Sequence, residues 1–165
     1  MTQYMSTGGL WVLALVIFLE YLNLPGFPAG IILPVAGIWA KSAHQSILVI
    51  LLVSTVSALV ASWILYGLGA WGGGYLVEKF TTKFPKRAPM LDKGFHYLRD
   101  KGSIGVFFAK LIPIFRTLIG FPAGVIQMNF WKYSMYSAFG ILVWNGVLMG
   151  LGYYLGEPVL QQFVR

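Results

Sequence analysis

The sequence predicts an all-α integral membrane protein in which a re-entrant hairpin followed by a transmembrane helix occurs twice, as an inverted repeat. The composition is 58% hydrophobic and 10% charged, with a mean hydropathy of +0.73, which is far from the composition of soluble domains. Long apolar runs with few charges are typical of segments inside a bilayer. The segment Gly-Phe-Pro-Ala-Gly occurs twice, at residues 26–30 and 120–124, and each copy interrupts an apolar run.

Composition also limits the class of protein. The absence of cysteine excludes disulfides, thiolate metal sites and cysteine nucleophiles. The net charge of +7 is better explained by basic cytoplasmic loops of a membrane protein than by nucleic-acid binding. The N-terminus shows no basic region before its apolar stretch and no small-residue cleavage site, so we expect no removed signal peptide. The length of 165 residues suits a single membrane domain over residues 1–165.

The first repeat is expected over residues 8–77 and begins with a hairpin. Residues 8–40 are apolar except for Glu20 and Asn23, and prolines stand at positions 25, 28 and 34. The uninterrupted piece before the first proline has about 15 residues, fewer than the roughly 20 that cross a bilayer. We therefore expect two short arms that enter and leave on the same side. Such irregular backbone is tolerated at membrane depth only beside protein or a water-filled cavity.

Residues 46–77 form the first expected transmembrane helix. Its small residues recur at helical spacing and offer a face for close helix packing, namely Ser54, Ser57, Ala58, Ala61 and Ser62. Glycines between positions 67 and 74 should loosen its end near the membrane interface. A glycine-rich phosphate loop is a weak alternative, because the following Lys-Ser/Thr is missing.

A basic loop is expected over residues 78–101, which hold seven basic and three acidic residues. The positive-inside rule places this loop in the cytoplasm and both termini outside. Two structures remain open for it. It is either a solvated loop or a short interfacial helix that buries Phe95 and Leu98 and holds its basic residues near anionic lipid.

The second repeat, over residues 102–156, follows the pattern of the first. Residues 104–131 are apolar and broken by Pro113 and Pro122, which predicts a hairpin entering from the opposite side. Residues 134–156 form the second expected transmembrane helix, with Trp144 and Asn145 near its middle. One crossing in each half gives the two halves opposite orientations, which defines an inverted-topology repeat.

Charged residues inside the apolar segments are the candidate site, because burying a charge in a membrane is costly. Arg116 stays charged, and its planar fork suits phosphate oxygens. Lys110 could reach the same anion if Pro113 kinks the chain between them. The alternative is that one or both side chains extend to the lipid headgroups. Glu20 either carries a proton, since burial disfavours its charged form, or stays ionised in a structural pair with Arg116 or Lys110.

The two Gly-Phe-Pro-Ala-Gly segments are expected to complete an anion site. A helix beginning at Pro122 would direct free backbone N–H groups and a positive dipole end at the midplane. Gly120 and Gly124 would let a ligand approach closely, and Pro28 and Gly30 would do the same from the other hairpin.

Asn145 is expected to hydrogen-bond between helices. The sequence shows no Ser-His-Asp set, carboxylate pair or His/Asp metal cluster, so we expect neither an enzyme nor a metal or cofactor.

The run from Phe107 to Thr117, followed by Ala123-Gly124 and Met128, resembles the signature of the DedA family, also called the VTT or SNARE-associated domain. The segments 18–20, 28–37 and 140–156 and the Tyr-x-x-Gly formed by Tyr66 and Gly69 are also similar to that family. The resemblance implies facing re-entrant hairpins and movement of lipids between leaflets, notably undecaprenyl phosphate, driven by the proton motive force. It assigns Glu20 to the family's first acid and Arg116 to its second arginine, and Lys110 stands at the first arginine.

Two departures from the family pattern matter for the mechanism. Many members have an acid where this chain has Gly30, and many have an Asp where it has Ser62. Glu20 is therefore the one acid in the apolar segments, which favours anion exchange over a relay of several carboxylates. Ser62, Tyr66 and Asn145 are expected to support the site. The expected partners are anionic membrane lipids, with protons and a second copy of the chain left open, and no nucleic acid.

Four functions compete at this stage. They are a flippase for a lipid phosphate, an energy-independent phospholipid scramblase, a membrane-bound phosphatase, and a structural partner of other membrane proteins. Lipid transport assays with and without a pH gradient would separate the first two, and phosphate release would revive the third.

Overall fold

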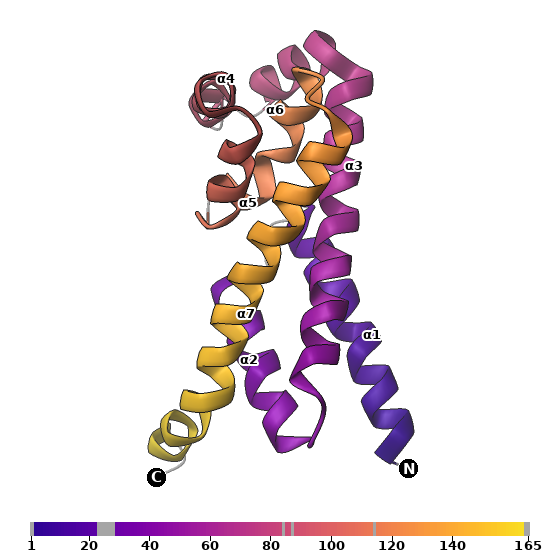
Figure 1. Ribbon diagram of the computed structural model, residues 1–165, viewed down its shortest axis with the longest axis vertical. Coiled ribbons are helices and arrows are strands. Elements are labelled where there is room, and N and C mark those ends of the chain that lie inside the picture. Colours follow the sequence, from indigo (N-terminus) through magenta and orange to yellow (C-terminus); the bar gives the residue numbers. More distant parts are fainter. Residues whose placement is uncertain (1, 23–28, 84, 87, 114, 164–165) are drawn as a thin grey trace.

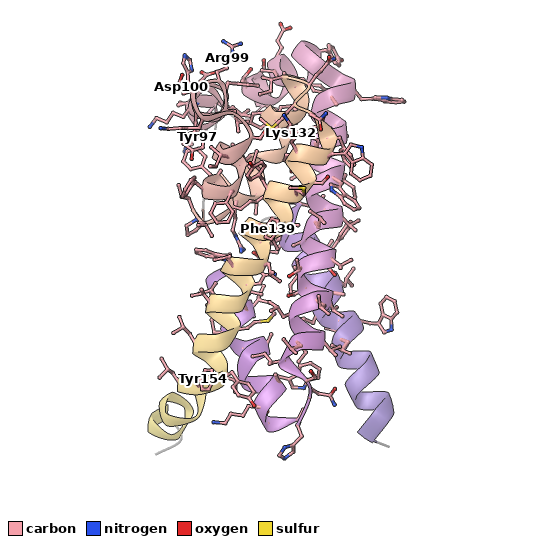
Figure 2. The ribbon with its side chains drawn as sticks, viewed as in Figure 1. Tyr97, Arg99, Asp100, Lys132, Phe139 and Tyr154 are labelled. Carbon is pink, nitrogen blue, oxygen red and sulfur yellow. The ribbon has the colours of Figure 1, made fainter. Side chains whose placement is uncertain are left out.

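The computed structural model describes residues 2–22, 29–83, 85–86, 88–113 and 115–163, which are helical apart from short turns and include no strand. The helices form an elongated bundle in which both chain ends lie at one end and helix α4 (Ala88–Lys110) lies at the other (Figure 1). The side chains of Arg99, Asp100 and Lys132 gather at the α4 end (Figure 2). Charge is therefore concentrated at the end of the bundle farthest from the termini.

The first two helices lie in the half of the bundle nearest the termini. Helix α1 (Thr2–Tyr21) runs from the terminal end toward the middle of the bundle, and α2 (Ala29–Ser42) returns to the terminal end (Figure 1). Two helices are thus present where two short arms were expected from residues 8–40, but α1 has 20 residues and begins before residue 8, so it is longer than the expected arm. The connection at 23–28, which includes Pro28 and most of the first Gly-Phe-Pro-Ala-Gly segment, lies outside the described residues.

Two helices run the length of the bundle. They are α3 (Ile47–Lys83) and α7 (Phe130–Phe163), and each has a stretch long and apolar enough to cross a membrane. Only about a third of each stretch is buried, 33% and 28%, and many large apolar side chains such as Leu52 and Val147 face outward. Exposed apolar surface of this extent suits lipid rather than water. The two long apolar helices expected at residues 46–77 and 134–156 are confirmed in position, and each extends beyond its predicted bounds.

The segment expected as a basic loop, 78–101, is largely helical. Helix α3 continues to Lys83 after a break at Gly73 (φ 44°, ψ −137°), and α4 begins at Ala88. Up to its own break at Gly102 (φ 59°, ψ −145°), α4 lies across the end of the bundle (Figure 1). Leu91 and Leu98, two turns apart, are buried, because this spacing puts them on one face. The segment is therefore a helix rather than a loop, as the short-helix alternative expects, and its contact with anionic lipid stays a prediction.

The second hairpin differs from its prediction in where the chain breaks. Beyond Gly102, α4 descends toward the middle of the bundle, and the chain returns through α5 (Phe115–Leu118) and α6 (Gly120–Val125) (Figure 1). The expectation that a helix begins at Pro122 is wrong, because α6 begins at Gly120. Pro122 sits in the first turn of α6, where its missing N–H costs nothing. The break falls at residues 111–113, where Pro113 cannot continue α4.

The two halves pack against each other with the same pattern of contacts. Helix α2 packs on α7, and α6 packs on α3, so the returning arm of each hairpin contacts the long helix of the other half. Both contacts use facing glycines. A Cβ added to Gly152 of α7 would lie 2.0 Å from the carbonyl oxygen of Pro34, and one added to Gly124 would lie 2.0 Å from that of Tyr66. The first arms are also equivalent, since α1 packs on α3 and α4 on α7.

Candidate functional site

Three ionisable side chains that the sequence places inside apolar segments come to lie in the protein interior. Glu20 is at the end of α1, Lys110 at the end of α4, and Arg116 in α5. Their exposed fractions are 4%, 0% and 0%. The alternative in which Lys110 or Arg116 extends to the headgroups is therefore wrong. The inner ends of the two hairpins meet here, because α1 contacts α5.

Arg116 and Glu20 form a buried ion pair between the two halves. Nη2 of Arg116 contacts Oε1 of Glu20. Removing two charges from water is costly, and the pair offsets part of that cost by mutual attraction. The other two nitrogens of the guanidinium, Nε and Nη1, have no hydrogen-bond acceptor among the described residues. Arg116 thus keeps donor capacity that Glu20 does not use.

Lys110 makes different contacts from Arg116. Its Nζ donates hydrogen bonds to Oγ of Ser62, at 2.8 Å, and to the carbonyl oxygen of Arg116, at 2.9 Å. These bonds tie the end of α4 to α3 and close the turn around Pro113. Gly140 of α7 makes room for the lysine stem, because a Cβ there would lie 2.6 Å from Cβ of Lys110. In this arrangement Lys110 holds the backbone that positions Arg116.

Two aromatic side chains beside Arg116 were missed by the sequence reasoning as site residues. The centroid of the Tyr21 ring lies 4.9 Å from Cζ of Arg116, and that of the Trp144 ring lies 5.4 Å from it. Nζ of Lys110 is 5.6 Å from the Tyr21 centroid. Such distances allow cation–π attraction. The available signal was adjacency, because Tyr21 follows the membrane acid and Trp144 precedes the buried Asn145.

The predicted supporting residues hold the long helices together around this cluster. Nδ2 of Asn145 donates to Oγ of Ser54 at 3.2 Å, so the predicted interhelical bond of Asn145 is confirmed. The carbonyl oxygen of Ser62 accepts a bond from the Tyr133 hydroxyl at 3.2 Å. The hydroxyl of Tyr66 donates to the carbonyl oxygen of Met128, beyond α6. Tyr66 therefore fastens the second hairpin to α3.

The predicted glycine and proline ligands of the second hairpin lie in packing contacts. A Cβ on Gly120 would lie 2.7 Å from the Tyr133 hydroxyl, and Gly124 faces α3. Pro122 packs on Gly94 of α4, since a Cβ there would lie 3.2 Å from the proline ring. These contacts hold α6 against its neighbours. In the first hairpin, Gly30 lies in the first turn of α2 and Pro28 lies outside the described residues.

A separate pocket of about 700 Å³ opens at the α4 end of the bundle. It lies between the ends of α3 and α6 and the amphipathic part of α4, and its charged lining residues are Glu78 and Arg99. None of the predicted site residues lines it. Within the described ranges, no group of three or more His, Asp or Glu side chains could hold a metal ion.

Comparison with known protein families gives a match to the VTT domain over residues 27–154. An uncharacterized membrane protein of Bacillus subtilis, YkoX, is 30% identical over 136 residues, 82% of this chain and 62% of that protein. Undecaprenyl phosphate transporter A of Staphylococcus aureus is 29% identical over 160 residues, 94% of this chain and 78% of its own length. An alkaline phosphatase-like protein of Lactococcus lactis is 28% identical over 160 residues, 94% of this chain and 74% of its own length. This chain thus spans less than two thirds of the length of the Bacillus relative. No solved structure matches this chain.

Proposed function

Because this chain belongs to the VTT domain family, also called the DedA family, we propose that it transports a lipid phosphate headgroup between the leaflets of the bacterial cell membrane. The lipid that we propose is undecaprenyl phosphate. The observation that carries the proposal is the buried guanidinium of Arg116 with its two unsatisfied nitrogens. A guanidinium edge binds phosphate oxygens through parallel hydrogen bonds. The name of the Staphylococcus aureus relative supports this substrate.

The proposal includes the inverted repeat. Each half would contain a re-entrant hairpin, α1–α2 in the first and the inner part of α4 with α5 and α6 in the second, followed by one crossing helix. The equivalent contacts of α2 with α7 and of α6 with α3 support this reading. So does the opposite placement of the two hairpins along the bundle (Figure 1). The basic α4 end would face the cytoplasm and both ends of this chain would lie outside.

The ion pair suggests how transport is coupled to protons. Glu20 occupies Nη2 of Arg116, so an arriving phosphate must compete with the carboxylate. Protonation of Glu20 removes its charge and weakens its hold on Arg116. A headgroup would then enter as Glu20 takes a proton, and leave as Glu20 is ionised again. Lys110 would keep the Arg116 backbone in place throughout.

The test is leaflet exchange of labelled undecaprenyl phosphate in liposomes that contain the purified protein, with and without a pH gradient. We expect exchange by the wild type to be faster with the gradient, and exchange by Arg116→Ala to fall to the protein-free rate. Glu20→Gln should still exchange lipid but without response to the gradient. Lys132→Ala, at an exposed position of α7, is the matched control and should behave as the wild type. Full activity of Arg116→Ala would contradict the proposal.

An energy-independent scramblase is the second candidate. The hydrogen bond from Lys110 to the Ser62 hydroxyl favours this function. A carboxylate at that position could pass a proton on, and among the described residues of the cluster Glu20 has no second acid as a relay partner. Exchange by the wild type that ignores the gradient would select this function. Phosphate release from the lipid would select a phosphatase instead. A wild type that neither exchanges lipid nor releases phosphate would favour a role as a structural partner of other membrane proteins.

A further inference from the structure

Tyr21 and Trp144 each bury a polar group that has no partner among the described residues. Tyr21 is fully buried, and its hydroxyl makes no hydrogen bond there. Nε1 of Trp144 is also buried and lacks an acceptor. Both rings lie against Arg116, and Nε and Nη1 of Arg116 also lack hydrogen-bond acceptors among the described residues. Two nitrogens of the Arg116 guanidinium and one donor on each of the two rings beside it, from α1 and α7, are therefore unsatisfied.

The chemistry of these groups restricts what could satisfy them. An indole N–H and a guanidinium can donate hydrogen bonds but cannot accept them, and a tyrosine hydroxyl can donate. Buried polar groups in folded proteins are almost always hydrogen-bonded. The carboxylate oxygens of Glu20 also make no hydrogen bond here, but one carboxylate cannot serve all of these donors, so the set implies a missing acceptor. Water brings as many donors as acceptors. A phosphate group brings several acceptor oxygens and a negative charge, which matches both the donors and Arg116.

We propose that the Tyr21 hydroxyl and Trp144 Nε1 are two further donors of a phosphate-binding site centred on Arg116. This inference rests on the proposed function and extends it to residues that neither the charge pattern nor the comparisons assign. While Glu20 holds Arg116, the two donors remain without acceptors. When a phosphate replaces Glu20, both gain one. Their hydrogen bonds therefore strengthen the loaded state and contribute nothing to the empty one.

The experiment replaces each donor by a ring that cannot donate, in Tyr21→Phe and Trp144→Phe. Matched controls are Tyr154→Phe and Trp71→Phe, whose side chains are 75% and 98% exposed. Purified proteins in detergent micelles are titrated with undecaprenyl phosphate and, separately, with inorganic phosphate. Melting temperatures are recorded with and without each probe. The two probes share the phosphate chemistry, and they distinguish a lipid headgroup from a free phosphate as the source.

We expect each site variant to bind undecaprenyl phosphate about tenfold more weakly than the wild type, which is the usual effect of one lost hydrogen bond to a charged group. Without a probe, Tyr21→Phe should melt at the wild-type temperature or higher, because its hydroxyl has no bond to lose. A purely structural hydroxyl would give the opposite result, a lower melting temperature in the empty protein. The two controls should match the wild type in both measurements.

The remaining outcomes separate this inference from the proposed function. If the site variants bind inorganic phosphate about tenfold more weakly than the wild type and no protein binds the lipid, the donor roles of Tyr21 and Trp144 are supported and lipid transport is refuted. If both site variants bind a probe as tightly as the wild type does, Tyr21 and Trp144 are not phosphate donors, and the proposed function is unaffected. A lower melting temperature of empty Tyr21→Phe would also overturn the donor role of Tyr21. Failure of the wild type to bind either probe would overturn both proposals.

Discussion

Breaking the Glu20–Arg116 pair should have different consequences depending on which partner is removed. Removing one partner of a buried ion pair typically costs about 3–5 kcal/mol, because the other charge stays buried. In Glu20→Gln the stranded partner is Arg116, which cannot lose its proton in a protein. In Arg116→Gln the stranded partner is a carboxylic acid, which can become neutral by taking a proton. The two single variants therefore differ in how they respond to pH.

The magnitude follows from the cost of protonating a glutamate. At pH 7 this costs about 3.7 kcal/mol and at pH 5 about 1 kcal/mol, so these are the upper limits of the part of the loss in Arg116→Gln that comes from the stranded carboxylate. The folded variant binds a proton that its unfolded chain releases, so its stability falls as pH rises. Relative to the wild type, the unfolding free energy of Arg116→Gln should rise by about 2.7 kcal/mol when the pH is lowered from 7 to 5. Glu20→Gln has no carboxyl group at position 20, and Lys110, the other titratable group beside Arg116, is present in the wild type as well. Relative to the wild type, Glu20→Gln should therefore regain no unfolding free energy.

The assay is reversible unfolding in mixed micelles at pH 7 and pH 5, followed by circular dichroism. Glu78→Gln is the matched control, because Glu78 is exposed near the end of α3 and its loss should stay within about 0.5 kcal/mol. The double variant Glu20→Gln with Arg116→Gln should lose less than the sum of the single losses. Equal losses of Arg116→Gln at both pH values, or a neutral Glu20→Gln, would refute the reasoning.

Three further predictions concern the packing and orientation of the helices. Gly152→Ala should lose about 1–3 kcal/mol of unfolding free energy, because its Cβ would meet the α2 backbone, whereas Gly150→Ala on the same helix meets nothing within 4 Å and should lose none. Gly73→Ala should lose about 1–3 kcal/mol in the same assay because of its positive φ, and its neighbour Gly74→Ala, which has open space, should not. In intact cells, a cysteine at position 86 (Lys86→Cys) should resist a membrane-impermeant thiol reagent, which reports on that site alone since the native chain has no cysteine. Labelling of this cysteine from outside the cell would contradict the proposed cytoplasmic position of the α4 end.

Much of the architecture could be predicted because membrane burial leaves few choices for a charged side chain. Glu20 and Arg116 stand far apart in the sequence, yet each needs a partner inside the bilayer, and the structure brings them together. The two long helices follow from apolar length alone. The partner of Lys110 did not follow in this way. Its bonds to a hydroxyl and to a backbone carbonyl depend on the turn at Pro113, which no pattern of charges reveals.

The errors have a common physical origin, since local signals compete with packing. Pro122 was expected to start a helix, but Pro113 is the proline that interrupts the chain, and the first turn of α6 tolerates the other. For the basic segment the sequence leaves both a solvated loop and a short helix open, and the burial of Leu91 and Leu98 against their neighbours identifies the helix. Tyr21 is ordinary in an apolar run. Its importance arises from the position of its ring over Arg116, which only the tertiary structure provides.

The exchange of hairpin arms between the halves also constrains the order of events during synthesis. Helix α2 packs on α7 where Gly37 meets Met149, about 110 positions later in the chain. A ribosome adds about 5–20 residues per second, so this partner emerges on the order of ten seconds after α2. Until then the first hairpin has no α7 to rest on, and Glu20 has no Arg116. A first hairpin that enters the bilayer as it is synthesised would therefore do so before native packing, and a chain truncated before α7 would leave α2 without its packing partner.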